Sequence, residues 1–204
     1  MALDRNQFLR LGAASVLAGA LGRAGVAAAQ EPTASGPTPE GEDIAYVQWG
    51  ATAEMVSIAY YTRALESGAF SKRVERRLHG AREADRKHLA KLNAVLGEDA
   101  PTDEDFEITL PASAFRTRAR ILRLGTDIEQ RVTGVYLDGI TRSTDEETRL
   151  LLGRLLLADS QHLTMLEGLA GRRLNVVGLR NPVRISEASP WLDRFLRSRS
   201  FPTR

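Results

Sequence analysis

The sequence predicts an all-α fold, a four-helix bundle made of two similar helix pairs joined by a long crossover. Three observations lead to this prediction. Apolar residues recur at helical spacing over four long segments, glycine or proline marks the ends of these segments, and the second pair of segments repeats the first. A chain of 204 residues can form one such core and carry further segments at both ends.

The internal repeat is a constant offset between ionisable and aromatic positions in the two halves of the chain. Residues 84–89 (ADRKHL) and 158–163 (ADSQHL) are nearly the same text. Because each half has the pattern of two helices, the repeat predicts two similar helix pairs. The offset is 75 residues for Glu54/Glu129 and Tyr61/Tyr136, and 74 residues for Asp85/Asp159 and His88/His162.

The N-terminal segment, residues 1–29, is typical of an export signal. A charged start is followed by an Ala/Gly/Leu run, and Ala27–Ala29 offers a small-residue cleavage site. Its start resembles a twin-arginine signal with Asn6 in place of the second arginine, so a general secretory route also stays open. We therefore expect a periplasmic, cell-envelope or extracellular protein without a further transmembrane segment. Residues 30–42 are predicted to be a flexible linker.

The helix boundaries follow from glycine stops, a proline and cap residues. Gly68 and Gly97 end the first two helices, and Thr144 with Glu147 forms a capping box at the start of the fourth. The segment between the second and third helices is rich in acids and predicts the long crossover. The predicted ranges are 43–67, 71–97, 111–142 and 144–171 for the four helices, and 98–110 for the crossover.

The C-terminal extension, residues 172–204, is locally basic and contains one short predicted helix. Ser189 and Pro190 have the N-cap and first-turn signature. Trp191, Leu192, Phe195 and Leu196 share one side of this helix and arginines share the other. We favour a latch packed on the bundle, while a docking or membrane-surface helix is the alternative. A homodimer, or a protein partner bound through this helix, also stays open.

Charge and cysteine content exclude several functions. The formal net charge is +2, and residues 1–29 carry three arginines and one aspartate, so the remaining chain is close to neutral. This balance argues against a general nucleic-acid-binding protein. There is no cysteine, so any metal must be held by oxygen and nitrogen ligands.

The candidate site comes from ionisable residues on the apolar faces of the four helices. Buried carboxylates would repel one another strongly without cations. Four carboxylates and two imidazoles suit a pair of divalent ions such as iron or manganese. In each Asp-x-x-His pair the two side chains are three residues apart and share a helix face. The six residues are Glu54, Asp85, His88, Glu129, Asp159 and His162.

This pattern resembles the ferritin-like superfamily, in particular exported bacterial proteins with a ferritin-like domain. The resemblance covers residues 43–171 and implies a di-iron or di-manganese centre that oxidises metal or handles oxygen or peroxide. Glu54, Glu129, His88 and His162 match the family's ligand motif. Asp85 and Asp159 stand where the family has glutamate. Because aspartate is shorter by one methylene, the sequence leaves open whether one ion, two ions or none is bound.

A metal-free interpretation uses the same residues. Asp85 with His162, and Asp159 with His88, could form an internal ion-pair network in a binding or structural bundle of the cell envelope. Tyr61 and Tyr136 are expected to be core aromatic residues with satisfied hydroxyls, and a redox or proton-relay role is the alternative. His79 is off the buried face and is expected at the surface.

Overall fold

The computed structural model describes residues 40–172 and 181–198. The predicted export signal and most of the predicted linker are outside these residues. The long helices are α2 (Glu42–Glu66), α3 (Lys72–Leu96), α4 (Arg118–Arg142) and α5 (Glu146–Leu169), and α6 (Ile185–Leu192) is short. The smaller elements are η2 (Gly97–Asp99), η3 (Ala112–Phe115), η4 (Asp193–Phe195), β1 (Phe106–Ile108) and β2 (Leu196–Ser198).

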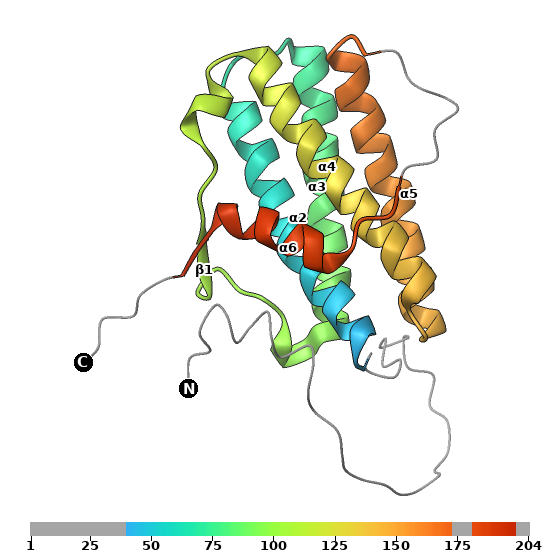
Figure 1. Cartoon of the computed structure of the whole chain (residues 1–204). Coiled ribbons are helices and arrows are strands. Elements are labelled where there is room, and N and C mark those ends of the chain that lie inside the picture. The colour runs from blue at the N-terminus through green and yellow to red at the C-terminus, as the bar shows by residue number, and fades with distance from the viewer. Residues whose placement is uncertain (1–39, 173–180, 199–204) are drawn as a thin grey trace, which may run out of the picture.

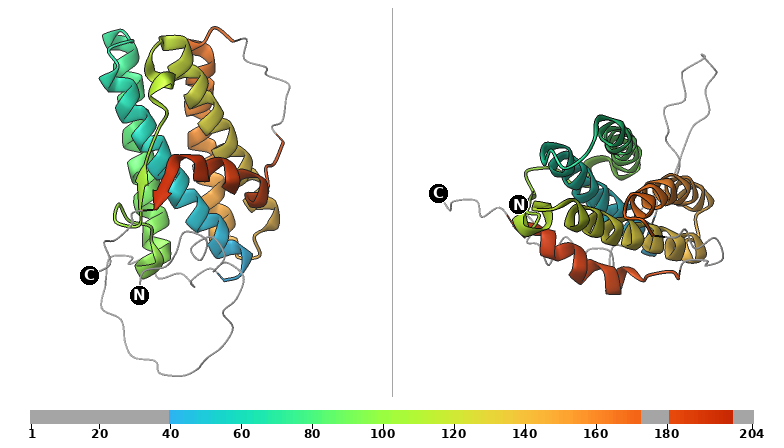
Figure 2. Two further views of the ribbon diagram at one scale, coloured as in Figure 1. Left: turned by 60° about the vertical axis from the view of Figure 1, so that its left-hand side comes forward. Right: turned by 90° about the horizontal axis from the view of Figure 1, so that it is seen from above.

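The four long helices form the predicted bundle of two pairs (Figure 1). α2 packs along α3, α4 packs along α5, and α2 and α4 meet in the middle, whereas α3 and α5 have few contacts. The crossover from α3 to α4 runs the length of the bundle, as the views in Figure 2 show. Within the described residues, no helix has the combination of length and apolarity that crossing a membrane requires.

Two predicted helix starts within the bundle are wrong. Pro111 opens only the η3 turn, and α4 begins at Arg118 because the Thr117 hydroxyl caps it by accepting from the Arg120 N–H. The capping box of Thr144 and Glu147 does not form. Asp145 caps α5 instead, and its carboxylate accepts from the Thr148 N–H at 2.7 Å.

Thr144 is unavailable as a cap because Asp43 binds it. The buried Asp43 carboxylate at the start of α2 accepts from the Thr144 N–H (3.1 Å), the Thr144 hydroxyl (3.0 Å) and the Asp145 N–H (2.9 Å). One aspartate therefore fixes the turn between α4 and α5 against the first helix, through a contact that local sequence does not reveal.

Replacing Asp43 should destabilise the bundle at this turn. Asp43→Ala leaves three donors without their acceptor, and we expect the free energy of unfolding to fall by about 1–3 kcal/mol. Urea denaturation measures the change. Glu104→Ala, in the exposed crossover loop, is the control and should shift the value by less than about 0.5 kcal/mol. Similar losses in both variants would contradict the role given to Asp43.

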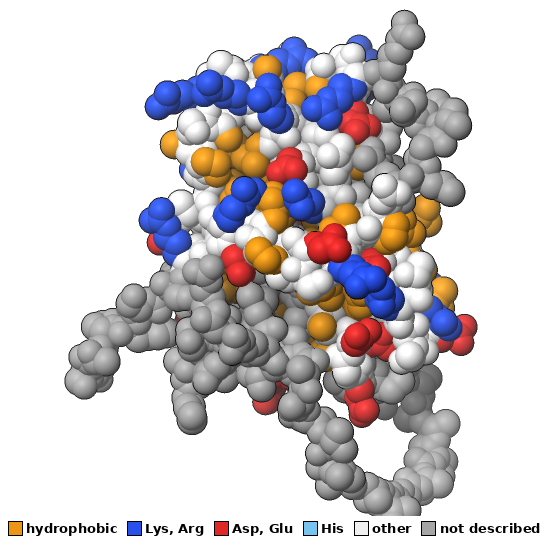
Figure 3. All heavy atoms as spheres, viewed as in Figure 1, with side chains coloured by type: hydrophobic (Ala, Val, Ile, Leu, Met, Phe, Trp, Pro, Cys, Tyr) orange, Lys and Arg blue, Asp and Glu red, His pale blue; other side chains and the backbone are white. Residues whose placement is uncertain are grey.

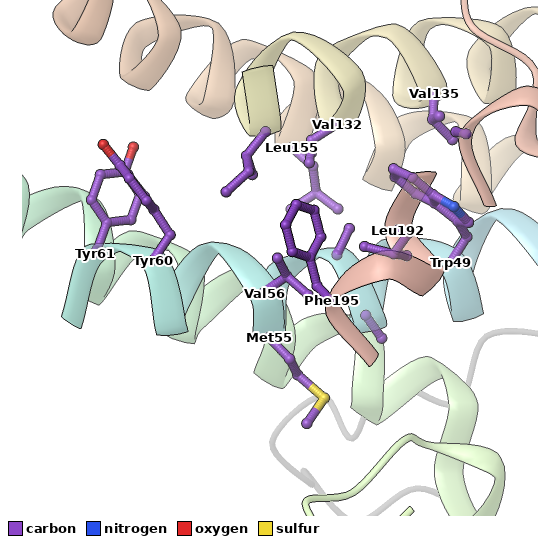
Figure 4. Packing of buried hydrophobic residues seen from close by; sticks show 14 of the residues in the cluster. Trp49, Met55, Val56, Tyr60, Tyr61, Val132, Val135, Leu155, Leu192 and Phe195 are labelled. Atoms are coloured by element: carbon purple, nitrogen blue, oxygen red, sulfur yellow. The ribbon is translucent and has the colours of Figure 1, made fainter. Parts of the chain in front are cut away.

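The C-terminal segment is the latch that the sequence favoured, although its helix begins earlier than predicted. α6 starts at Ile185, and Pro190 lies inside its last turn, where the missing N–H removes only one backbone hydrogen bond. Trp191 is buried and donates from Nε1 to the Asp127 carboxylate at 3.0 Å. Figure 4 shows Leu192 and Phe195 among the buried apolar side chains of α2 and α4.

β1 and β2 continue the latch as a two-stranded antiparallel sheet. Phe106 is paired with Ser198 and Ile108 with Leu196, which joins the crossover to the end of the described chain. The sequence analysis assigned the crossover to a loop and missed this sheet. Three-residue strands carry too little periodicity to be recognised without their partner.

The core contains close approaches between helices at glycines. Gly125 of α4 faces the Tyr60 ring of α2, which is fully buried and donates its hydroxyl to the Ile121 carbonyl. Gly50 of α2 faces the Tyr136 ring of α4 in the same way, and a Cβ there would lie 2.9 Å from a ring carbon. The α2–α4 interface is thus built from large aromatic rings packed against backbone.

Candidate metal centre

The six predicted ligand residues come together in the middle of the bundle. α2 and α4 each supply one glutamate, and α3 and α5 each supply an aspartate and a histidine one turn apart. The four carboxylates are each 1% exposed, whereas His88 and His162 are 7% and 9% exposed. His79 is at the surface beside Arg82, as expected.

The six side chains form two groups that overlap at Asp85. One group is Glu54, Asp85, His88 and Asp159, and the other is Asp85, Glu129 and His162. The possible ligand atoms of each group lie within 4.8 Å of one another.

The two aspartates occupy the space between the two histidines. Asp85 Oδ1 is 3.2 Å from Nδ1 of His162 and 3.8 Å from Nδ1 of His88. Asp159 Oδ1 is 3.3 Å from Nδ1 of His88 and 3.6 Å from Nδ1 of His162. Each short carboxylate therefore lies near both ends of the cluster.

The glutamates lie at the two ends of the cluster. Glu54 Oε1 is 3.5 Å from Nδ1 of His88, and Glu129 Oε1 is 3.8 Å from Nδ1 of His162. Each end is therefore one glutamate and one histidine, with both aspartates between them. This arrangement has the pseudo-twofold symmetry that the repeat in the sequence predicts.

Several atoms of this buried cluster have no hydrogen-bond partner among the described residues. These atoms are both carboxylate oxygens of Asp85, both of Asp159, and Nδ1 of His88 and of His162. The histidine nitrogens approach the carboxylates closely but without hydrogen-bond geometry. Buried polar atoms are nearly always satisfied, so these atoms are suited to bind a cation. Oxygen and imidazole nitrogen donors suit iron or manganese.

Electrostatics favour the same conclusion. Burial, and then the neighbouring carboxylates, raise the pKa of Glu54, Asp85 and Glu129 well above their usual range. Negative charge is thus unfavourable in the cluster as it stands, and a divalent cation would relieve the repulsion.

The two histidines differ in their charge environment. Burial acts to lower the pKa of His88, but its contacts with Asp159 and Glu54 outweigh burial and raise the pKa to about 10. Burial dominates at His162 and lowers its pKa. Without a cation, the two ends of the cluster therefore favour different protonation states despite their similar geometry.

Two tyrosines hold the glutamates from the opposite helix. Tyr61 of α2 donates its hydroxyl to Glu129 Oε1 of α4 at 2.6 Å, and Tyr136 of α4 donates to Glu54 Oε1 of α2 at 2.9 Å. Burial raises the pKa of both tyrosines, so each hydroxyl stays protonated and remains a donor. The hydroxyls are satisfied, as expected. The sequence analysis did not predict these tyrosine–glutamate hydrogen bonds. The two tyrosines and the two glutamates share the 75-residue offset, which was the available signal for them.

Removing one tyrosine hydroxyl should weaken metal binding. Tyr61→Phe leaves Glu129 without its orienting donor, and we expect metal affinity to fall by about 10–100-fold, measured by competition with a chelator. Tyr60→Phe is the matched control, because the Tyr60 hydroxyl is equally buried but donates to a backbone carbonyl. An equal loss of affinity in both variants would show that Tyr61 acts only through stability.

One protein-family model matches the chain. Residues 42–172 match the model of the ferritin-like domain family. The matched range contains all four long helices and all six residues of the cluster. No curated protein and no solved structure matches the chain.

Proposed function

The chain belongs to the ferritin-like domain family, and we propose that it binds two divalent ions, iron or manganese, in its central cluster. The observation that carries the proposal is the set of buried aspartate oxygens and histidine nitrogens without hydrogen-bond partners. The overlap of the two ligand groups at Asp85 supports two neighbouring ion positions.

Each residue has a role in this proposal. Glu54 and His88 would hold one ion, and Glu129 and His162 would hold the other. Asp85 and Asp159 would be available to both ions, because each lies between the two imidazoles. Tyr61 and Tyr136 keep the glutamates in place, and the surrounding apolar side chains exclude bulk water.

We propose metal oxidation, or the handling of oxygen or peroxide, as the activity. A bound pair of iron or manganese ions would supply the electron transfer that these reactions need. The imidazoles are the least buried members of the cluster, and they come from α3 and α5, which have few contacts with each other. Small reactants would therefore approach from the α3–α5 side.

Metal analysis of the purified protein tests the proposal. After growth with iron and manganese we expect two metal ions per chain, and anomalous diffraction should place them between the histidines. A protein without stoichiometric metal under these conditions would overturn it. The double variant His88→Ala/His162→Ala is the control and should contain less than one ion per chain.

We propose export through residues 1–29. The charged start, the Ala/Gly/Leu run and the small-residue cleavage site support this proposal. Cell fractionation of the full chain should place the protein outside the cytoplasm, and a chain without residues 1–29 should stay inside. Equal distribution of the two chains would contradict export. Hosts lacking the twin-arginine or the general secretory pathway would identify the route.

A metal-free envelope bundle is the second candidate, and the crossed contacts favour it. His162 lies 3.2 Å from Asp85, and His88 lies 3.3 Å from Asp159, which is the ion-pair network that the sequence analysis described. In this case the histidines and aspartates stabilise the fold, and metal adds nothing. Neutralising the aspartates separates the two candidates, because the expected changes in stability have opposite signs.

A further inference from the structure

The two ends of the bundle carry opposite charge. Lysines and arginines gather at the end where α2 and α5 finish and α3 and α4 begin, which is uppermost in Figure 3. Acids gather at the other end, in η2, the crossover loop and the first turn of α5. The basic end should attract anions by its summed field. Its cations include Arg63, Lys72, Arg73, Arg116, Arg120 and Arg123.

An open pocket of about 650 Å³ lies at this basic end, on the outer side of α4. Three arginines line it, Arg120 and Arg123 from α4 and Arg172 from the residues after α5. Arg120 Nη1 donates to the Ser113 carbonyl of η3 at 3.3 Å. The volume is in the range of small-molecule sites.

The arginines of this pocket lack carboxylate partners within the described part of the chain. Arg86 and Arg142 form ion pairs with Glu83 and Asp138 on their own helices, whereas neither Arg123 nor Arg172 forms one with a described residue.

Asp127 is the acidic residue that lines the pocket. It already accepts from Trp191 and lies 3.6 Å from Arg131 Nε, so the pocket keeps a positive excess.

We propose that this pocket binds a phosphate group. Three guanidinium groups and one aspartate leave an excess of two positive charges, and phosphate carries about 1.5–2 negative charges at neutral pH. Guanidinium donors match the oxygen geometry of phosphate. Ser113 and Gln130 also line the wall, and Gln130 Nε2 donates to Glu167 Oε1 at 3.4 Å. The ligand is either free phosphate or an anionic lipid headgroup, whose phosphodiester carries one negative charge, because guanidinium groups bind the phosphate oxygens of both.

Titration of the full chain with inorganic phosphate in EDTA buffer tests the site. Calorimetry should show saturable binding, and Arg123→Ala/Arg172→Ala should weaken it at least tenfold. Arg149→Ala/Arg154→Ala is the charge-matched control on the exposed surface of α5, and it should weaken binding less than twofold. Equal losses in the two double variants would show a general charge effect and overturn the proposal.

Two further experiments identify the source of the phosphate group and test whether phosphate binds at the metal centre instead. Sedimentation with vesicles of phosphatidylglycerol, compared with phosphatidylcholine, tests the headgroup. Saturable binding of either probe that depends on Arg123 and Arg172 supports the site, and binding of neither overturns it. His88→Ala/His162→Ala should keep its phosphate affinity, and a loss there would place the phosphate at the metal centre and overturn the proposal.

Discussion

Replacing the two central aspartates by asparagine should raise the stability of the metal-free protein and abolish its response to metal. Asparagine has nearly the same size as aspartate, so Asp85→Asn/Asp159→Asn removes buried charge without changing packing. In EDTA we expect the free energy of unfolding to rise by on the order of 1 kcal/mol or more, because four buried carboxylates face only two imidazoles and the double variant removes this excess.

With metal, the wild type should have a higher free energy of unfolding than the double variant. At free Mn²⁺ one hundred times above the dissociation constant, each occupied position adds about 2.7 kcal/mol to the stability of the wild type. The double variant gains nothing, because both carboxylates that serve the two positions have lost their charge. Urea denaturation in EDTA and in Mn²⁺ or Fe²⁺ gives all four values.

A third protein, Asp138→Asn, is the control for replacing a buried aspartate outside the cluster. Asp138 is also buried in α4, but it accepts from the Tyr46 hydroxyl and from Arg142 Nε. Asp138→Asn should therefore lose stability in both conditions and keep the full metal response. If the central double variant is less stable than the wild type in EDTA, the metal-free ion-pair network is the better description of the cluster.

Gly125→Ala should be among the most damaging single-methyl changes in the bundle. The added Cβ would overlap the Tyr60 ring, and this tyrosine is fully buried between α2 and α4. Overpacking of this kind costs about 1–3 kcal/mol or more, and a better helix propensity returns at most about 1 kcal/mol. We expect a net loss measurable by thermal or urea denaturation.

Gly80→Ala provides the matched control for this change. Gly80 is in the middle of α3, where an added Cβ meets nothing within 4 Å. The same substitution should therefore stabilise the protein by up to about 1 kcal/mol. Gly125→Ala should also weaken metal binding, because Tyr60 is next to the tyrosine that holds Glu129. Equal effects of the two substitutions would rule out the close approach.

The sequence predicted the long helices and all six cluster residues because both depend on periodicity. A carboxylate on a buried stripe, such as Glu54, is visible without knowing its neighbours. The repeat then placed Glu129 in the equivalent position. Symmetry and helical spacing together were sufficient to predict which side chains form the buried cluster.

Contacts between distant segments were not predictable in the same way. Ser143, Thr144 and Asp145 are all good caps, and the choice between them depends on Asp43, which is about one hundred residues away. The sheet between β1 and β2 and the tyrosine contacts are equally non-local. Local patterns cannot rank such alternatives, since the deciding energy comes from tertiary packing.

The crossed contacts make the two helix pairs interdependent. Tyr61 of the first pair serves Glu129 of the second, and Asp85 of the first approaches His162 of the second more closely than its own histidine. Neither hairpin alone contains a complete half-site. In the proposed metal-bound protein, ion uptake requires the two hairpins to be docked, and two separately expressed hairpins should reassociate more tightly when Mn²⁺ is supplied.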